Sequence, residues 1–188
     1  FLISTGFRGC ENAINPLDLA FGVLAGHKFI GLDNIEVYYA VVCGENGKIY
    51  TSEGRPPAPW IARNSGITQR LNGVKFLNSD DSSVAFAIGD SGKVLRSPDN
   101  GHTWQNISYN GSNFPDMNGL DVLPPNSPTD FSHVIAVGNG GSVVKSSISN
   151  GNWVWLEFPV NTNIKLNSVA VFEALIIAVV GDNSAIYV

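Results

Sequence analysis

The most specific spacing of chemically active side chains lies in one run of eight residues, 97–104. The run fits the pattern Ser-x-Asp-x-Gly-x-Thr-Trp at every defined position. The Asp99 carboxylate can accept hydrogen bonds from backbone amides inside a turn, and Gly101 can adopt a conformation that other residues resist. We expect Trp104 to anchor the following strand between two sheets, and His102 to face the solvent. The motif therefore predicts a structural turn, with the defined residues Ser97, Asp99, Gly101, Thr103 and Trp104.

Residues that could catalyse hydrolysis or bind a metal are present, but their spacing indicates no site. A glycosidase needs two carboxylates that face a sugar, and a sialidase also needs an arginine cluster and an activated tyrosine. The chain has five arginines, and no Tyr-Glu arrangement can be read at the predicted strand ends. Glu45, Asp90 and Asp182 fall in a turn that recurs along the chain, so turn chemistry explains them better than an ion does. We predict no catalytic residue, no metal and no cofactor.

The elements that position these residues recur four times. Each copy has an apolar run, a glycine, two turn residues and a second apolar run. The first glycines are Gly44, Gly89, Gly138 and Gly181, so the steps between them are 45, 49 and 43 residues. In these Gly-x-x-Gly turns, Asn, Asp and Gly tolerate the positive φ that a two-residue hairpin needs. A period of this length, with β-branched runs and no helical periodicity, predicts propeller blades.

The predicted fold is an all-β propeller of four-stranded antiparallel blades in one domain, residues 1–188. A strand and linker at 1–27 precede repeat units at about 28–66, 67–113, 114–162 and 163–188. Neighbouring blades would bury the faces that one blade leaves open. The fourth unit contains three predicted strands, and we expect Phe1–Thr5 to pair beside Ala185–Val188 and close the ring. The alternative is that the four units belong to a larger propeller.

Two sets of side chains occupy the same place in successive units. The asparagines are expected near the axis, where they either line a polar channel or bond neighbouring blades together: Asn72, Asn118 and Asn167. Trp60 and Trp153 are interpreted as equivalents of Trp104 and assigned to packing between blades. Trp155 has no equivalent and is the tryptophan left for stacking on a sugar.

Two features bear on covalent modification and location. Cys10 and Cys43 could form a disulfide between the N-terminal segment and the first unit, or could be two buried thiols. Asn106 and Asn110 each begin a glycosylation sequon. Together with the missing initiator methionine and the low lysine content, these features favour a location outside the cytoplasm.

Composition excludes two classes of function. Eleven Lys and Arg oppose sixteen Asp and Glu, a net charge of −5 with no basic run, which excludes a nucleic-acid binder held by phosphate contacts. No apolar stretch approaches the roughly 20 residues of a membrane-spanning helix. Irregular connections on such a scaffold usually carry function, so we expect a partner at residues 63–70, 110–116 or 124–131.

The run from Ala87 to Ser97, followed by the motif at 97–104, resembles the Asp-box propellers. Within these it is most similar to the photosystem II assembly factor family, over about residues 28–188. The resemblance implies a non-catalytic scaffold that binds a protein partner or a larger assembly. Sialidases and other glycosidases also contain Asp-boxes, so a carbohydrate-binding or glycosidase-like propeller is the alternative.

Overall fold

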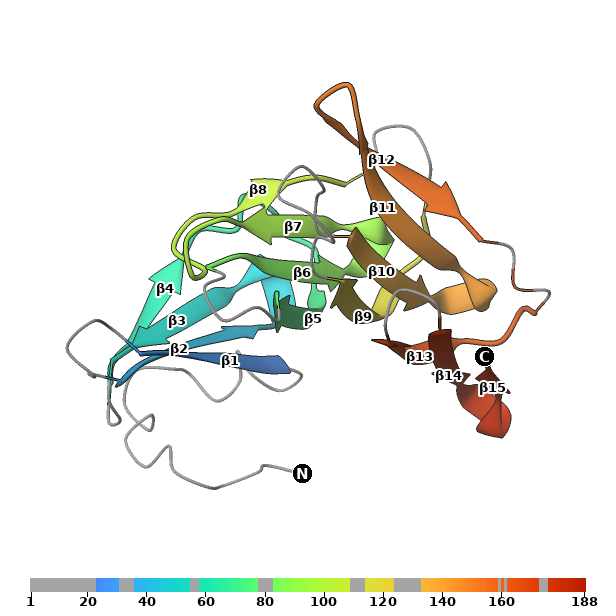
Figure 1. Cartoon of the computed structure of the whole chain (residues 1–188), viewed down its shortest axis with the longest axis horizontal. Coiled ribbons are helices and arrows are strands. Elements are labelled where there is room, and N and C mark those ends of the chain that lie inside the picture. Colours follow the sequence, from blue (N-terminus) through green and yellow to red (C-terminus); the bar gives the residue numbers. More distant parts are fainter. Residues whose placement is uncertain are drawn as a thin grey trace.

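The computed structural model is an all-β structure built from antiparallel sheets (Figure 1). It describes residues 23–30, 36–54, 58–77, 83–108, 114–123, 133–158, 160, 162–172 and 176–188. Among these residues, no helix is long and apolar enough to cross a membrane.

The described strands form four sheets, in each of which neighbouring strands follow chain order. The first sheet contains β1 (Val23–Ile30), β2 (Glu36–Cys43), β3 (Ile49–Glu53) and β4 (Trp60–Arg63). The second contains β5 (Leu71–Phe76), β6 (Ala85–Gly89), β7 (Val94–Ser97) and β8 (Gln105–Asn106). The third contains β9 (Met117–Leu123), β10 (His133–Gly138), β11 (Val143–Ser149) and β12 (Asn152–Glu157). The fourth contains β13 (Leu166–Phe172), β14 (Ile176–Gly181) and β15 (Ile186–Tyr187).

The predicted order of four antiparallel strands is present in the first three sheets, and three strands of the fourth are described. Phe1–Thr5, which we expected to complete the fourth sheet, lies outside the described residues. The pairing of that segment therefore stays a prediction.

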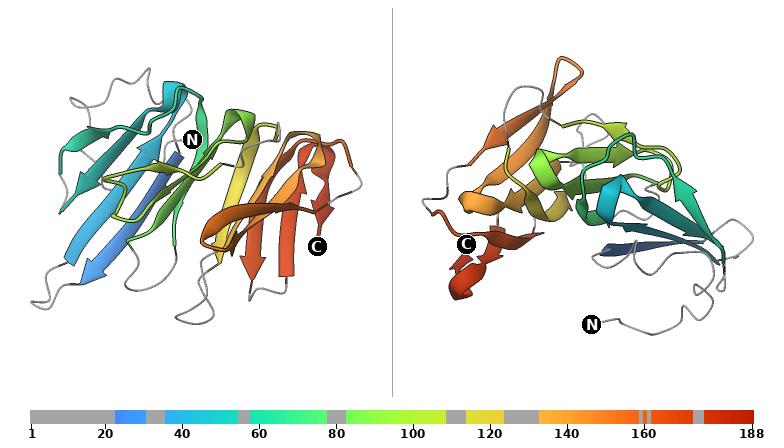
Figure 2. Two further views of the ribbon diagram at one scale, coloured as in Figure 1. Left: turned by 90° about the horizontal axis from the view of Figure 1, so that it is seen from above. Right: turned by 180° about the vertical axis from the view of Figure 1, so that it is seen from behind.

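The sheets follow one another along an arc (Figures 1 and 2). β1 contacts β5, β5 contacts β9, and β9 contacts β13, so the first strand of each sheet lies on the inner side of the arc. The strands β4, β8 and β12 lie on the outer side, and the first and fourth sheets form the two ends (Figure 1).

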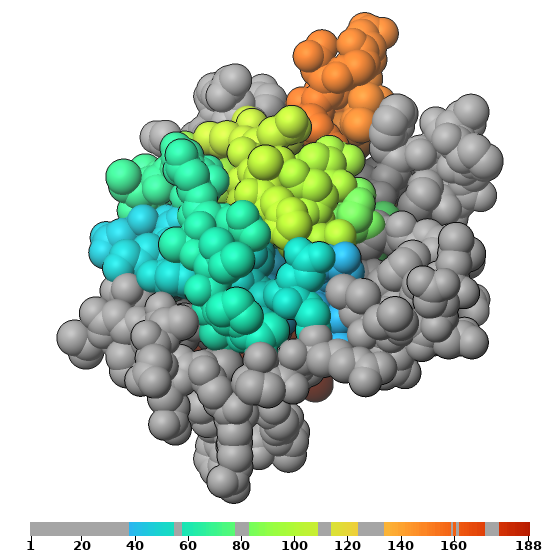
Figure 3. Space-filling view, turned by 90° about the vertical axis from the view of Figure 1, so that its left-hand side faces the viewer, coloured from blue at the N-terminus to red at the C-terminus, as the bar shows by residue number. Residues whose placement is uncertain are grey.

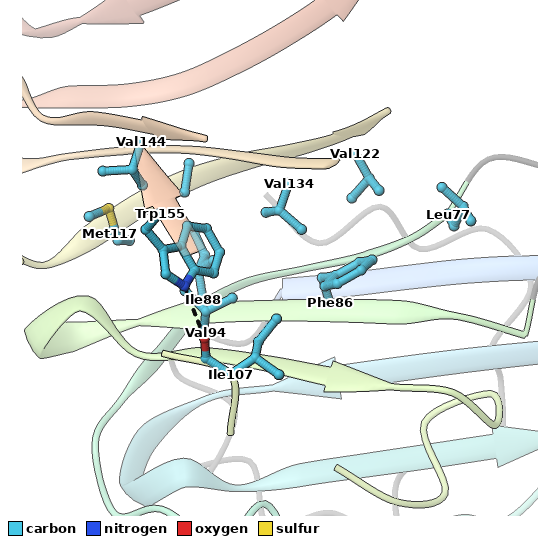
Figure 4. Packing of buried hydrophobic residues seen from close by; sticks show 11 residues of the cluster. Leu77, Phe86, Ile88, Val94, Ile107, Met117, Val122, Val134, Val144 and Trp155 are labelled. Atoms are coloured by element: carbon cyan, nitrogen blue, oxygen red, sulfur yellow. Dashed lines mark hydrogen bonds between the residues drawn. The ribbon is translucent and has the colours of Figure 1, made fainter. Parts of the chain in front are cut away.

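The core lies between successive sheets. One cluster joins the first and second sheets, a second joins the second and third, and a third joins the third and fourth. Figure 4 shows Ile88 and Val94 of the second sheet beside Trp155 of the third. All residues of β6 are buried, because this strand is covered on both faces. Each fully buried large apolar side chain contributes about 1.5–3 kcal/mol to stability, so packing between sheets is the main stabilising force.

The recurring hairpin turn has positive φ at its two central residues, as the turn chemistry predicted. The amide of Lys48 donates to the Glu45 carbonyl at 3.1 Å, and the two residues between them have φ of 57° and 66°. Two successive positive φ values are typical of a type I′ turn. The glycine that precedes the turn is therefore an extended residue, and the left-handed pairs are Asn46-Gly47, Ser91-Gly92, Gly140-Gly141 and Asn183-Ser184.

Candidate functional site

Residues 97–104, which we call the Asp-box after the motif that they resemble, form a closed network of hydrogen bonds that joins β7 to β8. Asp99 Oδ1 accepts from the Thr103 amide at 2.8 Å and from the Ser97 hydroxyl at 2.9 Å, while Oδ2 accepts from the Thr103 hydroxyl at 2.6 Å. Ser97 Oγ in turn accepts from the Gly101 amide at 2.8 Å. The indole of Trp104 donates to the Gly101 carbonyl at 2.9 Å. The polar side chains of the defined residues Ser97, Asp99, Thr103 and Trp104 are thus bonded inside the turn.

The surroundings of Asp99 favour its ionised form. Burial by itself raises the pKa of the carboxyl, but the hydrogen bonds from Thr103 and Ser97 and the charge of His102 lower it. The net result is a pKa below the ordinary aspartate value. A carboxylate held in this way orders a turn, and it already accepts three hydrogen bonds there.

Replacing Asp99 with alanine is expected to reduce the free energy of unfolding by about 1–3 kcal/mol, because the Thr103 amide and the Ser97 hydroxyl lose their acceptor. Urea denaturation followed by circular dichroism measures the change. Asp182→Ala is the matched control, since this exposed aspartate accepts one side-chain bond from Asn167, and its loss should cost about 0.5–1 kcal/mol.

The same variant also has an expected pH dependence. The lowered pKa means that the ionised carboxylate stabilises the folded state above the unfolded aspartate pKa of about 3.9, and that this contribution disappears as pH falls through the folded-state value. The stability difference between wild type and Asp99→Ala should therefore shrink in acid. A difference that stays constant down to about pH 2 would contradict this role for the carboxylate.

The Asp-box turn also contacts the first sheet. A Cβ on Gly101, whose φ is +86°, would lie 2.7 Å from Val41 Cγ2 and 3.0 Å from Thr51 Cγ2. His102 Nε2 lies 3.1 Å from Glu53 Oε2 on β3, and the imidazole side chain is 37% exposed. Our expectation that His102 faces the solvent is therefore only partly right, because the turn lies against the neighbouring sheet.

On the first sheet a tyrosine lies beside a carboxylate. We did not expect this pair, because the two residues are far apart in the sequence and come from paired strands. Tyr39 on β2 lies opposite Glu53 on β3. Burial raises the pKa of the Tyr39 phenol, and the negative charge and hydrogen bond of Glu53 raise it further. A raised pKa means that the Tyr39 phenol is protonated near neutral pH, with the Glu53 carboxylate as its hydrogen-bond partner.

The tryptophan that lies opposite the equivalent serine in the third sheet is Trp155, whereas Trp153, which we took as the equivalent of Trp104, packs against the second sheet as predicted. Strand pairing places Ser52 opposite Trp60 in the first sheet and Ser146 opposite Trp155 in the third, whereas Trp153 lies opposite Ile148. The β11–β12 hairpin continues to a turn at Asn150-Gly151 and projects from the molecule (Figure 3, orange). The longer hairpin shifts the strand register by two residues relative to the sequence spacing of the Asp-box.

None of the four tryptophans provides an exposed ring. Trp60 and Trp155 are buried, and Trp104 and Trp153 are partly buried against core clusters. Trp155 Nε1 donates to the Ile107 carbonyl of the second sheet at 3.0 Å (Figure 4). Trp155, which we had left free for a sugar, is therefore a core residue.

The aligned asparagines bond neighbouring sheets together. The Asn72 amide donates to the Met117 carbonyl of the third sheet at 2.9 Å, and the Asn118 amide donates to the Leu166 carbonyl of the fourth sheet at the same distance. Asn72, Asn118 and Asn167 also donate to the turns of their own sheets, where the acceptors are Asp90, Asn139 and Asp182 at 2.8, 3.0 and 2.7 Å. These contacts favour bonding between sheets over a ligand-lined channel.

A buried carboxylate links three sheets near the inner strands. Asp121 on β9 is 7% exposed. Its Oδ1 contacts the Lys75 ammonium of β5 and accepts from the Val122 amide at 2.7 Å, while Oδ2 accepts from the Val171 amide of β13 at 2.8 Å. The sequence offered no signal for this residue, because the equivalent positions in the repeat differ in chemistry.

The four hairpin turns lie on one side of the arc (Figure 2), and their first residues are Glu45, Asp90, Asn139 and Asp182. Arg70 lies 3.7 Å from Glu45 and 3.9 Å from Asp90, and its Nε donates to Asn72 at 2.6 Å. We call the four turns, together with residues 63–70, the turn face. Among the described residues, no three side chains of the metal-ligating types come together.

The connection after β4 is held in place on the turn face. Ser65 Oγ bonds both the amide and the carbonyl of Ile67 at 3.3 Å, and the Gly66 amide donates to Asn64 Oδ1 at 2.9 Å. Asn64 and Thr68 remain exposed. Of the three connections that we expected to contact a partner, this one is described in full, whereas residues 109–113 and 124–132 lie outside the described residues.

The predicted modification sites are only partly described. Asn106 is exposed on β8, and its Oδ1 accepts from the Ser108 amide and hydroxyl at 3.0 and 2.6 Å. Cys43 is fully buried on β2. Asn110 and Cys10 lie outside the described residues, so the second sequon and the disulfide stay predictions.

Comparison with protein-family models and with curated protein sequences gives no match for this chain.

Proposed function

We propose that this chain forms a non-catalytic Asp-box β-propeller, or an arc of a larger one, that binds a protein partner through its turn face. The repeat, the Asp-box network and the packing of successive sheets along an arc support the propeller assignment. The sequons and the low lysine content favour a location outside the cytoplasm.

The proposal rests on the hydrogen bonds that the polar side chains form. Asp99, Asp121 and the aligned asparagines are occupied by bonds within or between sheets. These reactive groups therefore serve the scaffold, and the turn face offers a polar surface for binding.

The chemistry of the turn face suits a protein partner. Asn64 and Thr68 are small, exposed and fixed by the bonded connection that carries them. Glu45 and Asp90 flank Arg70 and are partly exposed, which provides charges of both signs. Preorganised polar groups of this kind give specificity at the rim of an interface.

The double variant Asn64→Arg/Thr68→Arg tests the assignment. Immobilised wild type is expected to retain a partner from an extract of its native source, identified by mass spectrometry, and the double variant is expected to lose it. Leu156→Arg, an exposed residue on β12, is the control and should retain the partner. Equal retention by wild type and the double variant, or no partner at all, would refute turn-face binding, provided the three proteins have the same melting temperature.

A further inference from the structure

The tip of the β11–β12 hairpin presents an asparagine-glycine pair to the solvent. Asn150 and Gly151 are both exposed, and the hairpin that they close projects from the rest of the molecule (Figure 3, orange). β11 begins at the turn face and ends at this tip, so the pair lies at the other end of the strand from the proposed binding surface. Nothing in the proposed function uses these two residues.

An asparagine that precedes glycine can lose its side-chain amide without an enzyme. The backbone nitrogen of the glycine attacks the asparagine Cγ, the new N–Cγ bond closes a succinimide ring, and the Cγ–Nδ2 bond breaks to release ammonia. Water then opens the ring at either of its carbonyls and leaves aspartate or isoaspartate, in which the main chain runs through the side-chain carboxyl carbon. Water is the only co-reactant, and no electron is transferred. Glycine favours the reaction because it has no Cβ to obstruct the attack.

Ring closure requires the peptide between the two residues to rotate out of the turn. Asn150 and Gly151 have φ of 51° and 77°, which is typical of a type I′ turn. The glycine nitrogen must move toward the asparagine side chain, so the surroundings of the glycine must leave room for it. Segments with few packed neighbours open at a low cost in free energy. The packing around each glycine therefore decides which pair can react.

Most of the other asparagine-glycine pairs are held by hydrogen bonds. Six other asparagines precede glycine: Asn46, Asn72, Asn100, Asn110, Asn118 and Asn139. The side-chain amides of Asn72, Asn118 and Asn139 all donate hydrogen bonds, so the group that would leave is held. The Gly101 amide, which would attack Asn100, donates to Ser97 Oγ at 2.8 Å. Asn110 lies outside the described residues.

Asn46-Gly47 is the pair that matches Asn150-Gly151 in turn type. Both pairs have two successive positive φ values, and both asparagines are exposed. Gly47 is buried, and a Cβ there would lie 2.2 Å from the Ile67 carbonyl oxygen, so the peptide has no room to rotate. A Cβ on Gly151 would meet no atom within 4 Å beyond its chain neighbours. No described residue bonds the Gly151 amide or the Asn150 side chain.

We propose that Asn150 is a site of spontaneous deamidation in the folded protein, and that the fold protects Asn46. Conversion adds a negative charge to the hairpin tip. The isoaspartate product also lengthens the main chain by one methylene in a turn that closes by pairing Ser149 with Asn152. The tip contributes no residue to the core clusters between sheets, so the modified chain is expected to keep its fold.

Incubation of the full chain at mildly alkaline pH tests the proposal. Peptide mapping by mass spectrometry locates each amide-to-acid conversion, and methylation by an isoaspartyl methyltransferase detects isoaspartate. In the folded chain, Asn150 is expected to convert at least about 10-fold faster than Asn46, which corresponds to barriers that differ by about 1.4 kcal/mol. In urea that unfolds the chain, the two asparagines are expected to convert at similar rates, because packing no longer distinguishes their glycines.

Asn150→Gly is the matched variant, because a Gly-Gly pair also suits this turn, as at Gly140-Gly141. It should abolish conversion in the peptide that contains the hairpin tip and leave the melting temperature unchanged. The proposal would be overturned if Asn46 converts as fast as Asn150 in the folded chain, or if Asn150 stays intact while the unfolded chain reacts. Conversion that persists in the same peptide of Asn150→Gly would assign the reaction to another asparagine and would overturn it too.

Discussion

Asp121→Ala is expected to reduce the free energy of unfolding by about 2–5 kcal/mol, because the Val122 and Val171 amides lose their acceptor in a buried site. Val171 belongs to β13 and Asp121 to β9, so the loss weakens the contact between the third and fourth sheets. Urea denaturation followed by circular dichroism measures the change, with Asp121→Asn expected to fall between wild type and Asp121→Ala.

Lys75→Met is the control that separates the amide bonds from the ion pair. The Lys75 side chain is 43% exposed, so its ammonium can return to water when the contact is lost. Its removal should cost less than about 1 kcal/mol, as is usual for ion pairs that reach the solvent. A Lys75→Met penalty as large as that of Asp121→Ala would show that the charge pair, and not the pair of backbone amides, carries the stability.

Asp121 also marks the limit of what the repeat could predict. The repeat correctly indicated antiparallel sheets of sequential strands, because glycine spacing and β-branched runs are local signals. It could not indicate the link from Lys75 through Asp121 to Val171, because the equivalent position holds lysine, aspartate and alanine in successive sheets. Such a link depends on the distance between sheets, which no local pattern encodes.

The role of the aligned asparagines could also be predicted only in part from the sequence. Their alignment was visible in the sequence, but the choice between a channel and inter-sheet bonds was not. The decisive quantity is how closely the inner strands approach. A Cβ on Gly119 would lie 2.7 Å from the Ser168 Cα, so the glycine after Asn118 allows β9 to reach β13 and the Asn118 amide to reach Leu166. The two residues therefore act together: Gly119 lets β9 and β13 approach closely, and Asn118 bonds the two strands.

The tryptophans of the third sheet show how strand register overrides sequence spacing. Trp153 follows Ser146 at the same spacing as Trp104 follows Ser97, which led us to take Trp153 as the equivalent of Trp104. The longer β11–β12 hairpin moves the pairing so that Trp155 lies opposite Ser146. Nothing in the two residues themselves distinguishes them, since both are tryptophans on the same strand with their side chains on the same face.

This pairing predicts which tryptophan the fold depends on. Trp155→Ala is expected to reduce the free energy of unfolding by about 3–5 kcal/mol, because it leaves a large cavity between the second and third sheets. It also leaves the Ile107 carbonyl without the indole donor. Trp153→Ala removes a partly buried ring whose centroid lies 6.1 Å from that of Phe86, and should cost about 1–2 kcal/mol.

Trp155→Phe separates the hydrogen bond from the packing in the same experiment. The phenyl ring retains much of the buried apolar surface, so the remaining penalty should be about 1–3 kcal/mol, the usual cost of a buried acceptor without its donor. Circular dichroism is the appropriate probe of urea denaturation, because tryptophan fluorescence changes with each variant. A larger loss of stability in Trp153→Ala than in Trp155→Ala would show that the register assigned to β11 and β12 is wrong. Trp153 would then be the equivalent of Trp104, as the sequence spacing predicted.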